Sequence, residues 1–148
     1  MTPRFLTFVS TAIIAAAFTV SSQAKDFPEG SPKFVTDYPA AVAAAKKSGK
    51  PMLVVFSASW CPPCQANKKN VYPSDAVKPY HDKFIWAYLD TDIPANAEVA
   101  GKFKVSGIPH IQFLTKDGET LDKAIGGTSP QDFAKTLKNV LKKAAKKK

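Results

Sequence analysis

The sequence predicts an α/β fold in which one mixed β-sheet has helices on both of its faces. Two continuous apolar runs, 52–56 and 84–89, are typical of strands that are covered on both sides. The pair Asp117-Gly118 is a strong signal for a β-hairpin farther along the chain. Helical patterns surround these strands in the order helix, strand, helix, strand, helix, hairpin, helix. This order favours a mixed sheet between two layers of helix.

The N-terminal part of the predicted fold is a polar lead-in followed by one helix. Residues 25–36 contain two prolines and a glycine, which indicates an extended segment or a short edge strand. Asp37 is the expected N-cap of a helix that carries Pro39 in its first turn and stops near Gly49. The apolar run 52–56 follows and is the expected central strand.

The middle of the chain is expected to place short helical segments before a second buried strand. A helical stretch begins at Cys61 and runs to about Asn70. Pro73 and Pro79 then limit any helix to a turn or two before the strand at 84–89.

The C-terminal part is expected to complete the sheet and to add a closing helix. A short helix is expected at 96–103, and strands are expected at 110–115 and 119–124. Ser129 is the expected N-cap of an amphipathic helix, which has apolar residues at helical spacing to Ala144 and then frays into lysines.

Residues 1–24 have the features of a secretory signal peptide. A basic residue near the start precedes an apolar run at 5–20, and small residues stand before Lys25. We expect cleavage after Ala24, which leaves a single domain of residues 25–148 in an exported compartment. The alternative is an uncleaved membrane anchor, although the apolar run is shorter than the roughly 20 residues that span a bilayer.

The net charge of +9 is concentrated at the C-terminus. Residues 135–148 contain seven lysines and no acidic residue, whereas 13 lysines nearly balance 12 acidic residues over 25–134. A nucleic-acid binder would need a basic face interleaved with aromatic residues, so we expect no nucleic-acid partner. The lysine-rich end is expected to be solvated and to complement the helix dipole. The alternative is weak attraction to an anionic membrane surface or to an acidic partner.

Cys61 and Cys64 are the only cysteines, and they lie at the junction of a buried strand and a helix. The pair would be an incomplete zinc site, because there is no second Cys-x-x-Cys and because His81 and His110 are not spaced as a ligand pair. A structural disulfide that closes so short a loop would stabilise the fold little. A redox-active pair is therefore the better interpretation, and we expect no metal and no cofactor.

The strand-to-helix junction gives the two cysteines different chemistry. Cys61 faces the unpaired N–H groups of the first helical turn, which favour the thiolate form. Cys61 is therefore the expected nucleophile. Cys64 lies one turn inside the helix, where it is less exposed and can resolve the mixed disulfide formed at Cys61.

Two motifs of this sequence resemble those of the thioredoxin family. Residues 56–64, Phe-Ser-Ala-Ser-Trp-Cys-Pro-Pro-Cys, are similar to its active-site segment, and residues 105–109, Val-Ser-Gly-Ile-Pro, resemble its Gly-Ile-Pro loop. The resemblance extends over nearly the whole chain after the leader and implies the thioredoxin fold. It implies a cis-proline at Pro109 and pairing of bound substrate with the backbone of Ile108. It also favours substrate docking, rather than simple packing, for Trp60.

Among thioredoxin-like proteins, the leader, Lys50-Pro51 and the string at 70–73 resemble exported bacterial members and the thioredoxin-like domains of disulfide-reducing membrane transporters. Tryparedoxins share the Trp-Cys-Pro-Pro-Cys string but lack an export signal. The resemblance implies a periplasmic thiol-disulfide oxidoreductase that reduces or exchanges the disulfides of exported proteins. A membrane protein would donate its electrons, and the enzyme would be a monomer. The alternative is a non-catalytic binding module for a peptide or a soft metal ion such as Cu(I).

Two positions depart from the thioredoxin pattern. Many thioredoxins have a buried aspartate six residues before the first cysteine and a lysine on the neighbouring strand, whereas this chain has Val55 and Tyr88. Proton transfer at Cys64 must then use water, another side chain or the leaving thiolate of the substrate. His110 follows the expected cis-proline and is a candidate, but we favour a strand histidine on a surface face.

Overall fold

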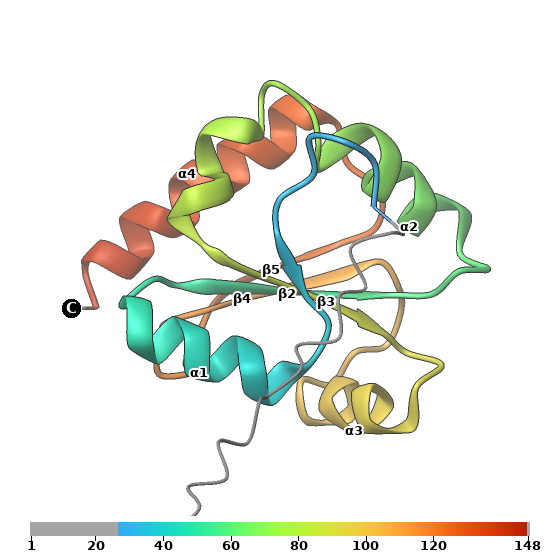
Figure 1. Ribbon diagram of the computed structural model, residues 1–148, viewed down its shortest axis with the longest axis horizontal. Coiled ribbons are helices and arrows are strands. Elements are labelled where there is room, and N and C mark those ends of the chain that lie inside the picture. The colour runs from blue at the N-terminus through green and yellow to red at the C-terminus, as the bar shows by residue number, and fades with distance from the viewer. Residues whose placement is uncertain (1–26, 148) are drawn as a thin grey trace, which may run out of the picture.

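The computed structural model describes residues 27–147, so the expected leader and its cleavage site lie outside the described residues. The chain forms one five-stranded sheet with helices on both faces (Figure 1). The strands are β1 (Phe34–Val35), β2 (Met52–Ser57), β3 (Ile85–Asp90), β4 (His110–Leu114) and β5 (Thr120–Ile125). Their order in the sheet is β1-β3-β2-β4-β5, which makes β2 the central strand, as the sequence predicts.

Helical segments connect these strands and cover the sheet. They are α1 (Tyr38–Ser48), α2 (Pro62–Ala66), the short π-helix η2 (Asn67–Val71), the 3-10 helix η3 (Lys78–Lys83), α3 (Pro94–Lys102) and α4 (Pro130–Ala145). The helices α1 and α3 cover one face of the sheet, and α2, η2 and α4 cover the other (Figure 1). Within residues 27–147, every helix is too short or too polar to span a bilayer.

Local sequence signals set several element ends. Asp37 caps α1 by accepting a hydrogen bond from Ala40 N at 2.7 Å, and Ser129 caps α4 in the same way. The predicted β4–β5 turn has Gly118 at φ 89°, a conformation that favours glycine. The helix α3 begins at Pro94, two residues before the predicted start, because the fixed φ of proline suits the first turn of a helix.

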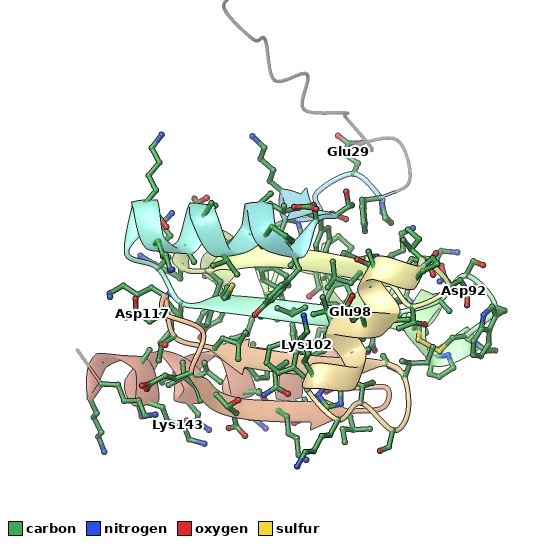
Figure 2. The ribbon with its side chains drawn as sticks, turned by 90° about the horizontal axis from the view of Figure 1, so that it is seen from below. Glu29, Asp92, Glu98, Lys102, Asp117 and Lys143 are labelled. Atoms are coloured by element: carbon green, nitrogen blue, oxygen red, sulfur yellow. A yellow bond between two sulfur atoms is a disulfide. The ribbon has the colours of Figure 1, made fainter. Side chains whose placement is uncertain are left out.

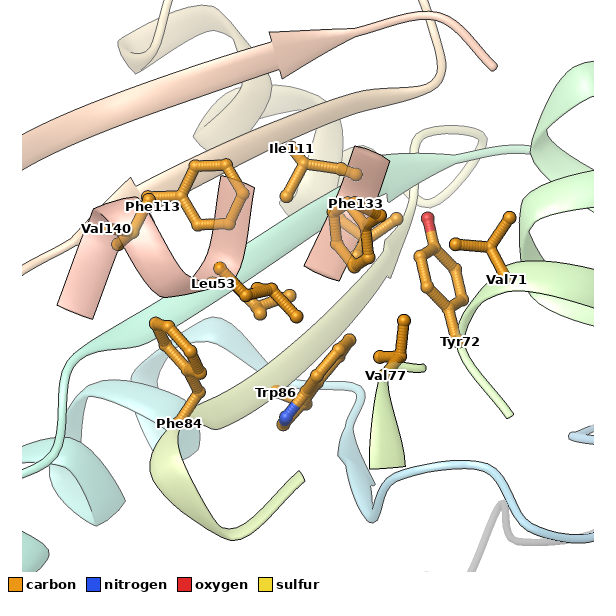
Figure 3. Packing of buried hydrophobic residues seen from close by; sticks show 12 residues of the cluster. Leu53, Val71, Tyr72, Val77, Phe84, Trp86, Ile111, Phe113, Phe133 and Val140 are labelled. Carbon is orange, nitrogen blue, oxygen red and sulfur yellow. The ribbon is translucent and has the colours of Figure 1, made fainter. Parts of the chain in front are cut away.

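Two apolar cores lie on the two faces of the sheet, because side chains alternate along β2. Leu53 and Val55 point to the α2–α4 face, whereas Met52, Val54 and Phe56 point to the α1–α3 face. Aromatic rings fill much of the α2–α4 core (Figure 3), and they belong to Tyr72, Phe84, Trp86, Phe113 and Phe133. Burial of these large side chains is a main source of the stability of the fold.

The strand directions bring the two sequence motifs to one edge of the sheet. Strands β1, β3 and β2 run parallel, β4 runs antiparallel to β2, and β5 runs antiparallel to β4. The carboxyl ends of β2 and β3 therefore lie at the same edge as the start of β4. Cys61 follows β2 and Pro109 precedes β4, so both residues lie at this edge.

Candidate active site

Cys61 and Cys64 form a disulfide just beyond the carboxyl end of β2 (Figure 2). Cys61 is the N-cap of α2 and Cys64 lies within this helix, with 5.3 Å between their Cα atoms. Both side chains are nearly inaccessible, because Cys61 is 4% exposed and Cys64 is 2% exposed. Pro62 and Pro63 form the start of α2 and are exposed. The pair thus occupies the strand-to-helix junction that the sequence predicts.

The Ile108–Pro109 peptide bond is cis, as the resemblance implies, and it lies beside the disulfide. The carbonyl oxygen of Ile108 is 3.7 Å from Cys61 Sγ, and Ile108 packs against Ala58 and the cysteines. Pro109 is buried, and its carbonyl oxygen accepts a hydrogen bond from Gly126 N at 2.8 Å. The fold therefore brings the two sequence motifs into contact.

Trp60 lies on the surface next to the disulfide and is 66% exposed. Its indole Nε1–H donates to the carboxylate of Asp92, with 3.0 Å to Oδ2 and 3.2 Å to Oδ1. Asp92 follows β3 and lies at the same end of the molecule as the disulfide (Figure 2). Sequence reasoning missed Asp92, and the one available signal is its place just after a strand parallel to β2. The hydrogen bond holds the indole at the surface, outside the apolar core.

Two further exposed apolar side chains lie at this edge of the sheet. Ile93 is 49% exposed and follows Asp92 in the β3–α3 loop, and Ile125 is 57% exposed and ends β5. Ile125 pairs with His110, the residue after the cis-proline, which places it near the disulfide edge. Exposed apolar side chains around a buried disulfide are suited to docking a polypeptide.

The position of the aspartate found in many thioredoxins is apolar in this protein. Val55 is 1% exposed and lies opposite Tyr88 in the β2–β3 register. The Tyr88 hydroxyl is 2.6 Å from the hydroxyl of Ser57, which is completely buried. Burial raises the pKa of Tyr88, and the hydrogen bond with Ser57 partly offsets this effect. These hydroxyls stay neutral at physiological pH, so they add no charge on this face of the sheet.

His110 is buried, so the expectation that it lies on a surface face is wrong. The side chain is 1% exposed, and its ring centroid is 5.9 Å from that of Phe56. Its Nε2 is 2.9 Å from Gln112 Oε1. His110 pairs with Phe56 and shares the α1–α3 face, whereas Val55 points to the α2–α4 face. The sheet therefore separates His110 from the face covered by the helix that carries Cys64.

A small cavity of about 160 Å³ opens beside the active-site segment. Ala58, Gln65 and Tyr88 are among the residues that line it. Lys68 also lines it, and its Nζ lies 4.6 Å from the ring centroid of Phe27, within cation–π distance. The cavity gives solvent a route to Tyr88, whose hydroxyl contacts the buried Ser57 hydroxyl.

Comparisons with known proteins agree with the fold and the motifs. The model of the thioredoxin-like family matches residues 33–116, which is more than half of the chain. A thioredoxin H-type protein of Oryza sativa subsp. indica is 34% identical over 91 residues, which cover 61% of this chain and 69% of that protein. The chloroplast thioredoxin-like protein HCF164 of Oryza sativa subsp. japonica is 33% identical over 89 residues, which cover 60% of this chain but only 33% of that protein.

A solved structure has the same fold. The solution structure of a thioredoxin from Thermus thermophilus matches with a TM-score of 0.69 and 29% identity, over 77% of this chain and 90% of that chain. The segment that matches the family model contains both the cysteine pair and the cis-proline. The chain therefore belongs to the thioredoxin-like family, has the thioredoxin fold, and contains the Cys-x-x-Cys pair of that family at Cys61 and Cys64.

Proposed function

We propose that the protein is a thiol-disulfide oxidoreductase that reduces or exchanges the disulfides of exported proteins. The observation that carries this proposal is the Cys61–Cys64 disulfide at the start of α2, in contact with the Ile108 carbonyl. The helix start favours a thiolate at Cys61 once the disulfide is reduced. The adjacent backbone of Ile108 offers hydrogen-bonding groups to an extended substrate chain.

The proposed reaction consists of two thiol-disulfide exchanges. The Cys61 thiolate attacks one sulfur of the substrate disulfide, forms a mixed disulfide, and displaces the other substrate sulfur as a thiolate. Cys64 then loses its proton and attacks the Cys61 sulfur, which restores the Cys61–Cys64 disulfide and releases the second substrate sulfur. The substrate gains two electrons and two protons, and the cysteine pair loses them. Because Val55 supplies no carboxylate, the Cys64 proton passes to water or to a substrate thiolate.

The surface around the cysteines supports a polypeptide as the substrate. Cys61 is only 4% exposed, so a substrate disulfide must approach closely over the neighbouring side chains. Trp60, which is held by Asp92, and Ile125 offer exposed apolar area near this point. A folded or partly folded protein can cover these side chains, whereas a small disulfide contacts little besides the sulfur.

The test of this function is cysteine-dependent reduction of insulin with dithiothreitol as the electron donor. Cys61→Ser should abolish turnover, because serine has nearly the same size but is a far weaker nucleophile. Cys64→Ser should stall at the mixed disulfide, since the resolving thiol is absent. If both variants reduce insulin at the wild-type rate, the reaction does not depend on the cysteines. That result would contradict the proposal and favour the non-catalytic binding module for a peptide or a soft metal ion.

Export through the predicted leader is the second part of the proposal. Cleavage after Ala24 should leave Lys25 as the N-terminal residue of a periplasmic protein. Intact-mass analysis of the periplasmic fraction measures this directly. A protein that retains residues 1–24 and stays in the membrane fraction would instead identify an uncleaved anchor.

The substrates and the membrane electron donor can be captured as mixed disulfides. A Cys64→Ser variant expressed with the leader should retain its substrates covalently on Cys61, because no second thiol releases them. Exported proteins should dominate the captured set. A captured set of proteins without export signals would argue against the periplasmic role.

A further inference from the structure

Asn67 is a buried polar residue at the end of the active-site helix. It is the first residue of η2, directly after α2, and it is only 1% exposed. Cys64, Asn67 and Val71 lie at helical spacing and are all buried, so an apolar side chain would suit this stripe. A buried amide is unfavourable unless its hydrogen bonds are made. The partners of the amide therefore indicate why an asparagine occupies this position.

The side-chain amide of Asn67 binds the backbone of residues 126–128, which we call the Gly126 loop. Its Nδ2 donates to the carbonyl oxygen of Gly126 at 3.4 Å, and its Oδ1 accepts from Thr128 N at 3.2 Å. Both ends of the amide are thus used on one short segment between β5 and α4. These hydrogen bonds join the Gly126 loop to the helical segment that carries the cysteines.

The Gly126 loop is hydrogen-bonded to the cis-proline motif and lies beside Pro63 of the cysteine motif. Gly126 N donates to the carbonyl oxygen of Pro109 at 2.8 Å. Gly127 lies close to Pro63, which is between the two cysteines in the sequence. A Cβ added at Gly127 would be 3.7 Å from the Pro63 Cβ. Gly126 has φ 91°, so this loop conformation favours glycine. Contacts therefore run from the active-site helix through Asn67 and Gly126 to Pro109.

A groove of about 520 Å³ lies between α2 and the Gly126 loop. Pro63 and Asn67 line it together with Gly127 and Thr128 of the loop. Because Asn67 joins the helix to the loop, it sets the separation of the two walls. A polypeptide bound at Cys61 has room to extend past Pro63 along this groove.

We propose that Asn67 is a positioning residue for disulfide exchange. It fixes the position of the Gly126 loop relative to Cys61, and through the loop it also fixes the position of Pro109. A bound protein substrate then presents its disulfide to the nucleophile. This inference rests on the proposed function. Because Asn67 acts through backbone contacts with the loop, its loss should weaken the use of extended substrates and leave the intrinsic reactivity of the cysteines intact.

The kinetic test compares Asn67→Leu with the matched variant Asn139→Leu. Leucine is similar in size to asparagine and removes both hydrogen bonds, whereas Asn139 is exposed on α4 and is not among the residues that line the groove. Asn67→Leu should lower kcat/KM for insulin by about tenfold, chiefly through KM. Its rate with the small disulfide dithiobis(nitrobenzoate) and its equilibrium with glutathione should stay within about twofold. Asn139→Leu should leave all three quantities near the wild-type values.

Amide hydrogen exchange supplies a readout at the loop itself. The Thr128 amide should exchange about tenfold faster in Asn67→Leu, because it loses its acceptor. Amides of α1, on the opposite face of the sheet, should keep their wild-type rates, which shows that the fold is intact. If Asn67→Leu does not fold, Asn67→Ala is measured in the same way.

Two outcomes would overturn the inference. One is unchanged insulin kinetics in the Asn67 variants, and the other is an equal loss with insulin and with the small disulfide. Failure of the wild-type protein to reduce insulin would instead reject the proposed function. If the wild-type protein reduces insulin and the Asn67 variants do so equally well, only this inference is rejected and the proposed function stands.

Discussion

Cys61 has few backbone donors to stabilise its thiolate, because the next two residues are prolines. Pro62 and Pro63 stand at the first helical positions of α2 and have no N–H, so the Cys64 amide is the first donor that this helix provides. No histidine lies between the cysteines to add positive charge. A weakly stabilised thiolate makes the reduced form less favourable, which lowers the reduction potential.

We therefore expect a reduction potential nearer to about −270 mV, the thioredoxin value, than to about −120 mV, the value of a strong oxidant. Pro63→Ala restores one N–H donor and should raise the potential by about 30 mV. Equilibration with glutathione measures both proteins, and Pro79→Ala, in the first turn of η3, is the control. A wild-type potential near the oxidant value, or no shift in Pro63→Ala, would contradict the donor argument.

Single residues of the site were predictable where local sequence defines their surroundings. The spacing of Cys61 and Cys64 and the position of Pro109 are local features that can be read without a structure. Asp92 and Asn67 were missed, because they bind partners 32 and 59 positions away. Their contacts depend on the strand order and on the placement of the β5–α4 loop, which no local pattern encodes.

Among the elements, α4 has a side-chain cap at its start. Ser129 Oγ accepts from Asp132 N at 3.1 Å and donates to Asp132 Oδ2 at 2.8 Å, so Ser129 is the N-cap of the helix. The hydrogen bonds of Asp132 with Ser129 and Lys135 lower the pKa of its carboxyl group. The carboxylate also complements the positive end of the helix dipole.

Ser129→Ala should lower the free energy of unfolding by about 1 kcal/mol, because the first turn of α4 loses its cap. Urea denaturation at neutral pH measures the change. Ser106→Ala, in an exposed loop, is the matched control and should have almost no effect. Equal stability of Ser129→Ala and the wild type would show that packing of Phe133 alone fixes the start of the helix.

Sequence periodicity predicts whether a segment is a helix or a strand better than it predicts which of its faces are buried. In β4, His110 and Gln112 alternate with Ile111 and Phe113, a pattern that indicates one solvent-exposed face. The structure buries both faces of β4, because α1 and α3 cover the face that carries His110. On this face His110 Nε2 is hydrogen-bonded to Gln112 Oε1. The π-helix at Asn67–Val71 likewise has no sequence signal, and the sequence predicts only a continuous helical stretch.

On the scale of the whole molecule, the β4–β5 hairpin partly neutralises the lysine-rich C-terminus. Lys143 Nζ lies 2.7 Å from Asp122, and Lys147 Nζ lies 3.2 Å from Glu119. These ion pairs are on the surface, where such pairs contribute little to stability. Ala144 is half-buried near the end of α4. Within the described residues, the end of α4 and Lys147 are thus attached to the hairpin by weak surface contacts.

Deletion of residues 144–148 should therefore leave folding and disulfide reduction nearly unchanged. The melting temperature should fall by only a few degrees, because the variant loses one exposed ion pair and part of the last helical turn. Thermal unfolding and the insulin assay measure these effects. A loss of most activity would show that the segment takes part in docking, and weaker binding to anionic vesicles alone would support membrane attraction.

Alkaline pH should destabilise the whole fold through its buried tyrosines. Burial raises the pKa of Tyr38, Tyr72 and Tyr88 above the ordinary value of about 10. The unfolded chain then releases these protons at a lower pH than the folded chain, so the free energy of unfolding falls as the pH rises above about 10. Urea midpoints between pH 8 and 11 measure the fall. Tyr72→Phe should make it less steep, and an unchanged slope would contradict this origin.

The strand β1 has only two residues, yet it covers part of the outer edge of β3. Phe34 and Val35 pair with Trp86 and Ala87 of β3. A chain shortened to begin at Asp37 would expose the edge of β3 that pairs with β1 at Trp86 and Ala87, and β3 is a mainly apolar strand of six residues. Such a strand is a template for pairing between molecules. Recombinant fragments of this protein should therefore keep the segment before the first helix, since trimming it would promote aggregation.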